Sequence, residues 1–197
     1  MKDQRLRLVK AFLKAEYDKH LEAFKRMDIR KNRIVLLGDS LVAYAKDLIE
    51  DSVNLGIPGD TTQGVIDRLD LVYPFDPSRV VLWIGSNDLV LTDDDNETIA
   101  ERILWIRDEL EDNMAGRVIV ATLAPVNEDR FEKHMFARDN RDIIAINAIL
   151  RREVEDIVDA HRVLVENGKL RDDYTTDGLH LTDEGYAAFA RALSLKL

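Results

Sequence analysis

The stretch "IVLLGDSLVAYA", from Ile34 to Ala45, contains the change of pattern that decides the fold. Its four leading apolar residues are typical of a strand that is buried on both faces of a parallel sheet. Gly38 then permits a tight turn, and an apolar stretch with a helical pattern begins at once. Ser40 stands at this junction, either as a helix cap or as a nucleophile among unpaired backbone N–H groups. Serine is a favoured cap, so this stretch alone favours the cap.

The alternation of short apolar runs and helix-like segments continues along the chain. Runs rich in Val, Ile and Leu predict five strands, at residues 34–37, 53–55, 80–84, 118–121 and 163–165. Segments with a helical period predict helices between and after them, at 41–50, 62–72, 97–112, 138–160 and 183–195. Strand and helix in repeated succession predict a three-layer α/β fold with a parallel sheet and right-handed crossovers.

An amphipathic helix is predicted before the first strand, over residues 3–27. We expect it to pack on the flank of the domain, with a homodimer contact as the alternative role. No composition shift, repeat or low-complexity tract divides the chain. We therefore predict one domain over residues 1–197, with the amphipathic helix occupying its first part, residues 1–30.

Composition excludes several classes of partner. The chain of 197 residues has 28 basic and 38 acidic residues and a net charge of −10, which disfavours nucleic acids and anionic membrane surfaces. Its apolar runs are too short for a membrane span, and the N-terminus shows no secretory signal. The absence of cysteine excludes disulfides and thiolate metal sites, and it fits a cytoplasmic protein.

Polar residues follow four of the predicted strands, where ligands bind in open parallel sheets. These stretches are Gly38-Asp39-Ser40, "NLGIPGDTTQG" (54–64), "WIGSNDL" (83–89) and "YTTDGLHLTDEGY" (174–186). Each has a plain reading as a turn or a helix start. Together they supply the parts for acyl transfer through an acyl-enzyme.

Each part has a chemical role in that reaction. Ser40 would be the nucleophile, His180 the base, and Asp177, three residues earlier, the group that orients the histidine. Gly59 can direct a backbone N–H at an oxyanion. Asn87 offers an amide donor that does not titrate.

Cofactor and metal sites are not predicted. The glycine-rich loop lacks the Gly-Lys-Ser/Thr of a phosphate-binding loop, and "LTDDDNET" (91–98) lacks the spacing of a calcium loop. The other histidines, His20, His134 and His161, lie in unrelated segments, which disfavours a metal at His180. We expect His134 to be a surface residue.

With these blocks in order, the chain resembles the GDSL, or SGNH, esterases. Ser40 matches the serine of G-D-S-L, Gly59 the block II glycine, Asn87 the asparagine of G-x-N-D, and Asp177 and His180 the D-x-x-H block. Within this family, the chain most resembles bacterial proteins that are similar to the platelet-activating-factor acetylhydrolase catalytic subunit.

The resemblance implies a flavodoxin-like sheet in the order 2-1-3-4-5. It also implies a Ser40–His180–Asp177 triad, with an oxyanion hole made by the Ser40 and Gly59 N–H groups and the Asn87 side chain. The expected activity is hydrolysis of small or short-chain acyl esters. A carbohydrate O-deacetylase, a lysophospholipase or a thioesterase would use the same triad, and a non-catalytic binding protein is the alternative from another class.

Three further residues are predicted to contact the substrate. Ile57 and Leu179 flank the expected catalytic positions. Val126 lies near the start of a segment, 123–140, that follows the fourth predicted strand and is long for a connection between a strand and a helix.

Overall fold

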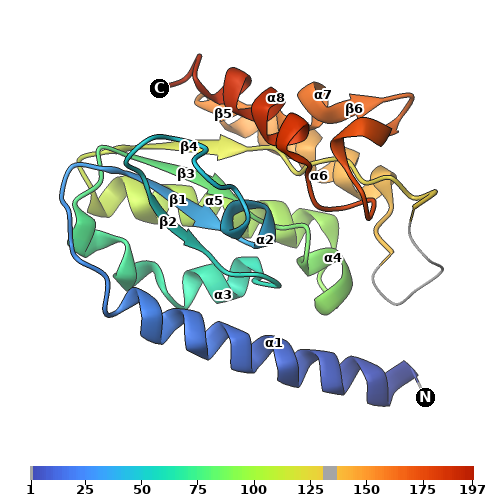
Figure 1. Ribbon diagram of the computed structural model, residues 1–197, viewed down its shortest axis with the longest axis horizontal. Helices are drawn as coiled ribbons and strands as arrows, with labels where there is room; N and C mark the ends of the chain where they lie inside the picture. Colours follow the sequence, from blue (N-terminus) through green and yellow to red (C-terminus); the bar gives the residue numbers. More distant parts are fainter. Residues whose placement is uncertain (1, 131–136) are drawn as a thin grey trace.

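The five-stranded parallel sheet is present in the computed structural model, which describes residues 2–130 and 137–197 (Figure 1). The strands lie in the order β2-β1-β3-β4-β5, which confirms the expected topology. Their bounds are β1 Ile34–Gly38, β2 Val53–Gly56, β3 Arg79–Trp83, β4 Arg117–Ala121 and β5 Ile157–Val158.

Helices cover both faces of this sheet and make the predicted three layers (Figure 1). The helices are α1 Lys2–Phe24, α2 Ser40–Ala43, α3 Thr62–Ile66, α4 Asp88–Leu91, α5 Asn96–Asn113, α6 Asn140–Glu153, α7 Ala160–Leu164 and α8 Asp183–Leu193. Short 3₁₀ helices lie at Leu69–Leu71, Tyr73–Phe75 and Asp172–Tyr174, and a small hairpin joins β6 Val165–Glu166 to β7 Lys169–Leu170.

Alternate residues of each strand enter two separate apolar cores. In β1, Val35 and Leu37 pack with α3, α5 and α6, whereas Leu36 packs with α2, α7 and α8. Both faces of the strand are therefore buried, which is why its sequence is continuously apolar rather than alternating. In the second core, Trp83 of β3 stacks on Phe189 of α8 with ring centroids 4.0 Å apart.

Helix α1 lies along the outside of the α3 layer (Figure 1). The Tyr17 hydroxyl donates a hydrogen bond to the Gly64 carbonyl in α3, and Phe24 packs against the first core. The helix therefore packs on the flank, as the sequence predicts. A dimer contact stays a prediction, for which the exposed Leu8 and Phe12 would supply apolar surface.

The fifth strand is the element that the sequence places wrongly. The run 163–165 belongs to the end of α7 and the start of β6, and the edge strand is β5, inside the segment predicted as helix 138–160. A two-residue strand carries no readable period, and a three-residue apolar run fits a strand or one buried helical turn equally well. The helix predicted over 41–50 is also shorter, because α2 ends at Ala43.

Asp39, rather than Ser40, is the cap of α2. Its carboxylate accepts a hydrogen bond of 2.9 Å from the Leu41 N–H, so that Ser40 becomes the first residue of the helix. Gly38 is required by close approach, since a Cβ there would lie 1.9 Å from the Trp83 carbonyl oxygen of β3. The junction is therefore tightly packed against the neighbouring strand.

Asp39 should make the stability of the protein depend on pH. Burial raises the pKa of this carboxyl to about 7, far above the unfolded value of about 4. Between these values the folded state holds a proton that the unfolded state has lost, so the free energy of unfolding falls as pH rises. Asp39→Asn keeps a capping oxygen and removes the charge. The variant should therefore lose less stability than wild type as pH rises. The difference in free energy of unfolding, variant minus wild type, should increase by on the order of 2 kcal/mol between pH 5 and pH 8.

Urea denaturation of both proteins at the two pH values measures this difference. Asp112→Asn, at an exposed position near the end of α5, is the matched control and should leave the difference unchanged. Equal pH dependence in wild type and Asp39→Asn would show that Asp39 is ionised in the folded protein at both pH values.

Candidate active site

Three of the four predicted polar stretches lie at the carboxyl ends of neighbouring strands β2, β1 and β3. The fourth, which holds Asp177 and His180, does not follow a strand of the main sheet directly as expected. It lies between the 3₁₀ helix Asp172–Tyr174 and α8, which brings it to the same edge from the other end of the chain.

Ser40, His180 and Asp177 form a continuous chain of hydrogen bonds. The Ser40 Oγ lies 3.0 Å from His180 Nε2, and His180 Nδ1 lies 2.6 Å from Asp177 Oδ2. Ser40 is 7% exposed, whereas the histidine and aspartate side chains are 33% and 50% exposed. A hydroxyl, an imidazole and a carboxylate in this order can pass a proton from the hydroxyl to the ring.

The loop around Asp177 holds its carboxylate in place. Its Oδ1 accepts hydrogen bonds from the backbone N–H groups of Leu179, at 2.9 Å, and of His180, at 2.8 Å. Burial raises the pKa of Asp177, but the hydrogen bonds from the His180 ring and these N–H groups outweigh it and hold the pKa below its usual value. The carboxylate is therefore ionised at neutral pH and oriented toward the imidazole.

Two tyrosines that the sequence reasoning missed lie beside this chain. The exposed Tyr44 ring packs edge-on against His180, with ring centroids 5.3 Å apart. The Tyr186 hydroxyl of α8 donates to the Leu41 carbonyl of α2 at 2.9 Å, which joins the helix after the histidine to the helix of the serine. Neither tyrosine belongs to a spacing pattern that would have marked it.

The loop after β2 is positioned by its contacts with β1 and with Asn87. The Ile57 N–H donates to the Gly38 carbonyl at 3.0 Å, and Asn87 Nδ2 donates to the Asp60 carbonyl at 2.9 Å. Gly59, between them, has a φ of +79°, a conformation that favours glycine. The N–H groups of Gly59 and Ser40 donate to no other described residue, so they remain available to a ligand.

A buried ion pair between Arg68 and Asp60 holds the loop after β2 in place. The Arg68 guanidinium, 1% exposed, lies 2.8 Å from the Asp60 carboxylate and also donates to the Leu55 and Gly38 carbonyls. Burial raises the pKa of Asp60 to about 6, against the lowering effect of Arg68. Nothing in the spacing of the sequence identifies Arg68 as the partner, because it lies on the far side of α3.

The three predicted substrate contacts stay predictions, and they differ in how far they are buried. Ile57 and Val126 are both 0% exposed, and Val126 lies in the first apolar core, so a bound substrate would have to displace core packing to touch them. Leu179 is partly exposed beside His180. His134 lies outside the described residues.

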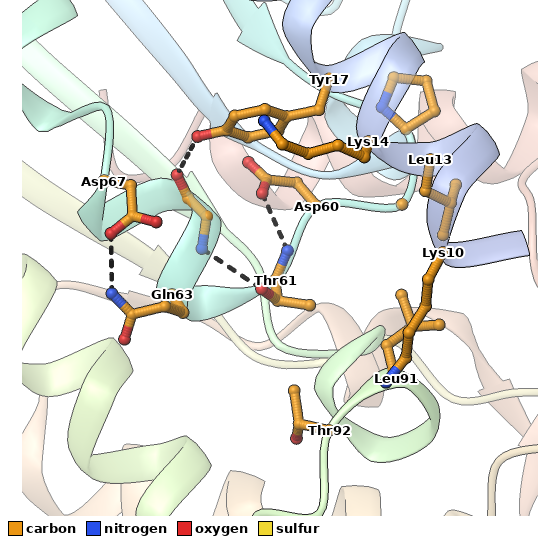
Figure 2. Close-up of a pocket in the computed structure, with 13 residues that line it drawn as sticks. Lys10, Leu13, Lys14, Tyr17, Asp60, Thr61, Gln63, Asp67, Leu91 and Thr92 are labelled. Atoms are coloured by element: carbon orange, nitrogen blue, oxygen red, sulfur yellow. Dashed lines mark hydrogen bonds between the residues drawn. The ribbon is translucent and has the colours of Figure 1, made fainter. Parts of the chain in front are cut away.

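A pocket of about 360 Å³ adjoins the Gly59 loop on the side of α1 (Figure 2). The Tyr17 hydroxyl of α1 donates a 2.8 Å hydrogen bond to the Gly64 carbonyl of α3, which joins two sides of the pocket. Burial raises the pKa of Tyr17 to about 12. The side chains labelled in Figure 2 come from α1, from the loop after β2, from α3 and from the end of α4: Lys10, Leu13, Lys14, Tyr17, Asp60, Thr61, Gln63, Asp67, Leu91 and Thr92. Helix α1 is thus a wall of this pocket as well as a flank helix.

Metal ligands do not gather in the part of the chain that the structure describes: no three His, Asp or Glu side chains there lie together as a metal site. Over the same residues, no helix combines the length and apolar character that a membrane crossing needs.

Comparison with known proteins gives solved structures with the same fold. A Streptococcus pneumonia protein, provisionally described as a platelet activating factor, superposes with a TM-score of 0.85 and 24% identity, over 98% of this chain and 97% of its own. A GDSL-like lipase from Bacteroides thetaiotaomicron gives a TM-score of 0.78 and 20% identity, over 92% and 96%.

Curated relatives match at the sequence level. Platelet-activating factor acetylhydrolase IB subunit alpha1 of Rattus norvegicus is 27% identical over 83% of this chain and 74% of its own length. N-acylneuraminate cytidylyltransferase of Escherichia coli is 29% identical over 82% of this chain, which spans 39% of that enzyme's length.

A family model decides the assignment. The model of the GDSL-like lipase/acylhydrolase family matches residues 36–188, a range that contains all four polar stretches. Since this match covers most of the chain, the protein belongs to the GDSL-like lipase/acylhydrolase family of ester-bond hydrolases.

Proposed function

We propose that this protein is a serine esterase that hydrolyses short-chain acyl esters, with Ser40 as its nucleophile. The observation that carries the proposal is the chain Ser40 Oγ–His180 Nε2–Asp177, with distances of 3.0 and 2.6 Å. A nucleophile within hydrogen-bond reach of a base, which a third group orients, is the arrangement that covalent acyl transfer needs.

In the first half of the reaction, the Ser40 oxygen attacks the ester carbonyl while His180 Nε2 takes the serine proton. The tetrahedral intermediate then breaks its bond to the alcohol oxygen, and His180 returns the proton to the leaving alcohol. An acyl-serine remains. In the second half, His180 takes a proton from the water that attacks the acyl group. The second tetrahedral intermediate then breaks its bond to the Ser40 oxygen, which takes the proton back from His180, and the carboxylic acid leaves.

Asp177 orients the ring and stabilises its charge. The short contact to His180 Nδ1 selects the tautomer whose Nε2 can accept the serine proton. Once the ring is protonated, the ionised carboxylate lies next to the positive charge. No metal or cofactor enters these steps.

The oxyanion of the tetrahedral intermediate would be held by three donors: the backbone N–H groups of Ser40 and Gly59 and the side chain of Asn87. Ser40 is the first residue of α2, where an N–H has no partner within the helix. Gly59, in the loop after β2, has a positive φ, and Asn87, in the loop after β3, donates a hydrogen bond to the carbonyl of the residue after Gly59, Asp60. These two observations support Gly59 and Asn87 as neighbouring donors.

A short acyl group, acetyl first, is the substrate that the relatives favour. One curated relative is named as an acetylhydrolase, and a structure with a TM-score of 0.67 and 20% identity is named as an acetyl xylan esterase. A carbohydrate O-deacetylase is therefore the second candidate. A lysophospholipase or a thioesterase would use the same residues. The absence of cysteine and the net charge of −10 fit a cytoplasmic enzyme that acts on a small ester.

Labelling and a substrate panel test the proposal together. We expect an organophosphate to add one group, on the peptide that contains Ser40, when the protein is digested and analysed by mass spectrometry. With p-nitrophenyl esters, kcat/KM should be highest for acetate and fall with chain length. Acetylated sugars and acyl thioesters in the same panel separate the alternatives. Labelling at another residue would remove Ser40 as the nucleophile, and no hydrolysis with no labelling would favour a binding protein.

A further inference from the structure

Arg138 is a buried cation that the reaction as described above does not use. It is 5% exposed and lies immediately before Asp139, the cap of α6. Its Nε donates to the Ser86 carbonyl at 2.8 Å, and its Nη2 donates to the Asn87 Oδ1 at 2.7 Å. One planar guanidinium therefore holds two consecutive residues of the loop that follows β3.

These contacts determine which end of the Asn87 amide faces which neighbour. A guanidinium has only donors, so it can pair with the Asn87 oxygen and not with its nitrogen. At the other end of the amide, the Asp60 carbonyl oxygen can only accept a hydrogen bond. It accepts one from Asn87 Nδ2, at 2.9 Å. Both neighbours select the same orientation, which keeps the NH₂ group on the side of the Gly59 loop. The second N–H of that group is then available to a ligand.

The charge of Arg138 also acts on the amide. A hydrogen bond from a cation to the amide oxygen draws electron density toward that oxygen, which makes the amide N–H a stronger donor. Opposing charges that act on Arg138 include the buried Asp39 and the half-exposed Asp177. Both raise the pKa of Arg138, against the lowering effect of burial. A neutral side chain at this position would lose both the orientation and the polarisation.

We propose that Arg138 is a positioning residue for catalysis, which orients and polarises the Asn87 amide toward the oxyanion. This inference rests on the proposed function, since it requires Asn87 to be an oxyanion donor. It assigns the role to a side chain outside the four motif blocks. Because Arg138 acts through Asn87, its contribution should disappear when Asn87 is absent.

A double-mutant cycle tests that dependence. With p-nitrophenyl acetate, Arg138→Met should lower kcat by about 10- to 100-fold with KM within about 2-fold, because the oxyanion forms only after binding. In the Asn87→Ala background, the same substitution should lower kcat by less than about 3-fold. Arg138→Lys keeps a cation beside Asp39 but lacks the fork geometry, so its kcat should lie between those of wild type and Arg138→Met.

Controls separate positioning from structural damage. Arg141→Met removes an exposed arginine three residues further on, whose side chain pairs with Asp139, and should leave kcat unchanged. Thermal unfolding of every variant reports its stability. If Arg138→Met does not fold, Arg138→Lys in both backgrounds carries the cycle.

The outcomes distinguish this inference from the proposed function. If Asn87→Ala alone keeps the wild-type kcat, Asn87 is no oxyanion donor. This inference then fails, whereas the proposed function loses one of its three oxyanion donors and keeps Ser40 as its nucleophile. If Asn87→Ala lowers kcat but the Arg138 substitution lowers it by the same factor in both backgrounds, Arg138 does not act through Asn87. That result overturns the inference and leaves the proposed function standing.

Discussion

Ser40→Ala is expected to lower kcat for p-nitrophenyl acetate by about 10⁴-fold or more. Without the Oγ atom no acyl-enzyme can form, and His180 can only activate water, which is less well placed. The oxyanion donors remain, so a small residual rate above that of buffer is expected. Stopped-flow assays of wild type should show a burst of p-nitrophenol equal to the enzyme concentration if deacylation is the slower half, and the variant should show none.

The fold of Ser40→Ala should be intact. Asp39, and not Ser40, caps α2, so the substitution removes no helix cap. Among the described residues, the hydroxyl's one hydrogen bond is to His180. The free energy of unfolding should change by less than about 1 kcal/mol. Ser52→Ala, which removes a hydroxyl bonded to the Ile49 carbonyl, is the matched control and should keep full activity. A Ser40→Ala enzyme as fast as wild type would refute the nucleophile assignment.

Asn87→Ala is expected to lower kcat by about 10²- to 10³-fold while KM changes little. The amide would act on the negative charge that develops in the transition state and is absent from the bound ester, so its loss raises the barrier without weakening binding. This pattern differs from that of Ser40→Ala, because the acyl-enzyme still forms. Labelling of Ser40 by an organophosphate should persist at a reduced rate.

The control for Asn87 must also lose a buried amide. Asn147 of α6 is 0% exposed and bonds through both ends of its amide to the backbone of Leu123, at 2.8 and 2.9 Å. Asn147→Ala should lower the stability by about 1–3 kcal/mol and leave kcat within a few-fold of wild type. Equal losses of kcat in the two variants would show that the effect of Asn87→Ala comes from structural damage.

Among the elements of the fold, those with a clear period were predictable from the sequence. A continuous apolar sequence predicts buried strands at 34–37 and 80–84, because both faces of the sheet are covered. A helical period of apolar residues predicts the helix at 97–112, because one side of α5 packs in the core. The edge strand β5 was not predictable. It has two residues, and its place depends on pairing with β4 rather than on its own pattern.

For the site, residue type and position after a strand were sufficient to select Ser40, Gly59 and Asn87, and the close spacing of Asp177 and His180 selected that pair. Arg68 and Arg138 were missed. Each is one arginine among many, and only the packed structure shows that these two are buried among backbone carbonyls, where a cation needs such partners.

By itself, the sequence determined the α/β succession, the family blocks and the chemistry that each block can supply, because period and residue type are local properties. The tertiary structure alone decided that His180, 140 residues away in sequence from Ser40, lies 3.0 Å from the serine oxygen. The orientation of the Asn87 amide between Arg138 and Asp60 is likewise tertiary. These arrangements depend on which segments pack together, and that is settled by the burial of both sheet faces rather than by any local pattern.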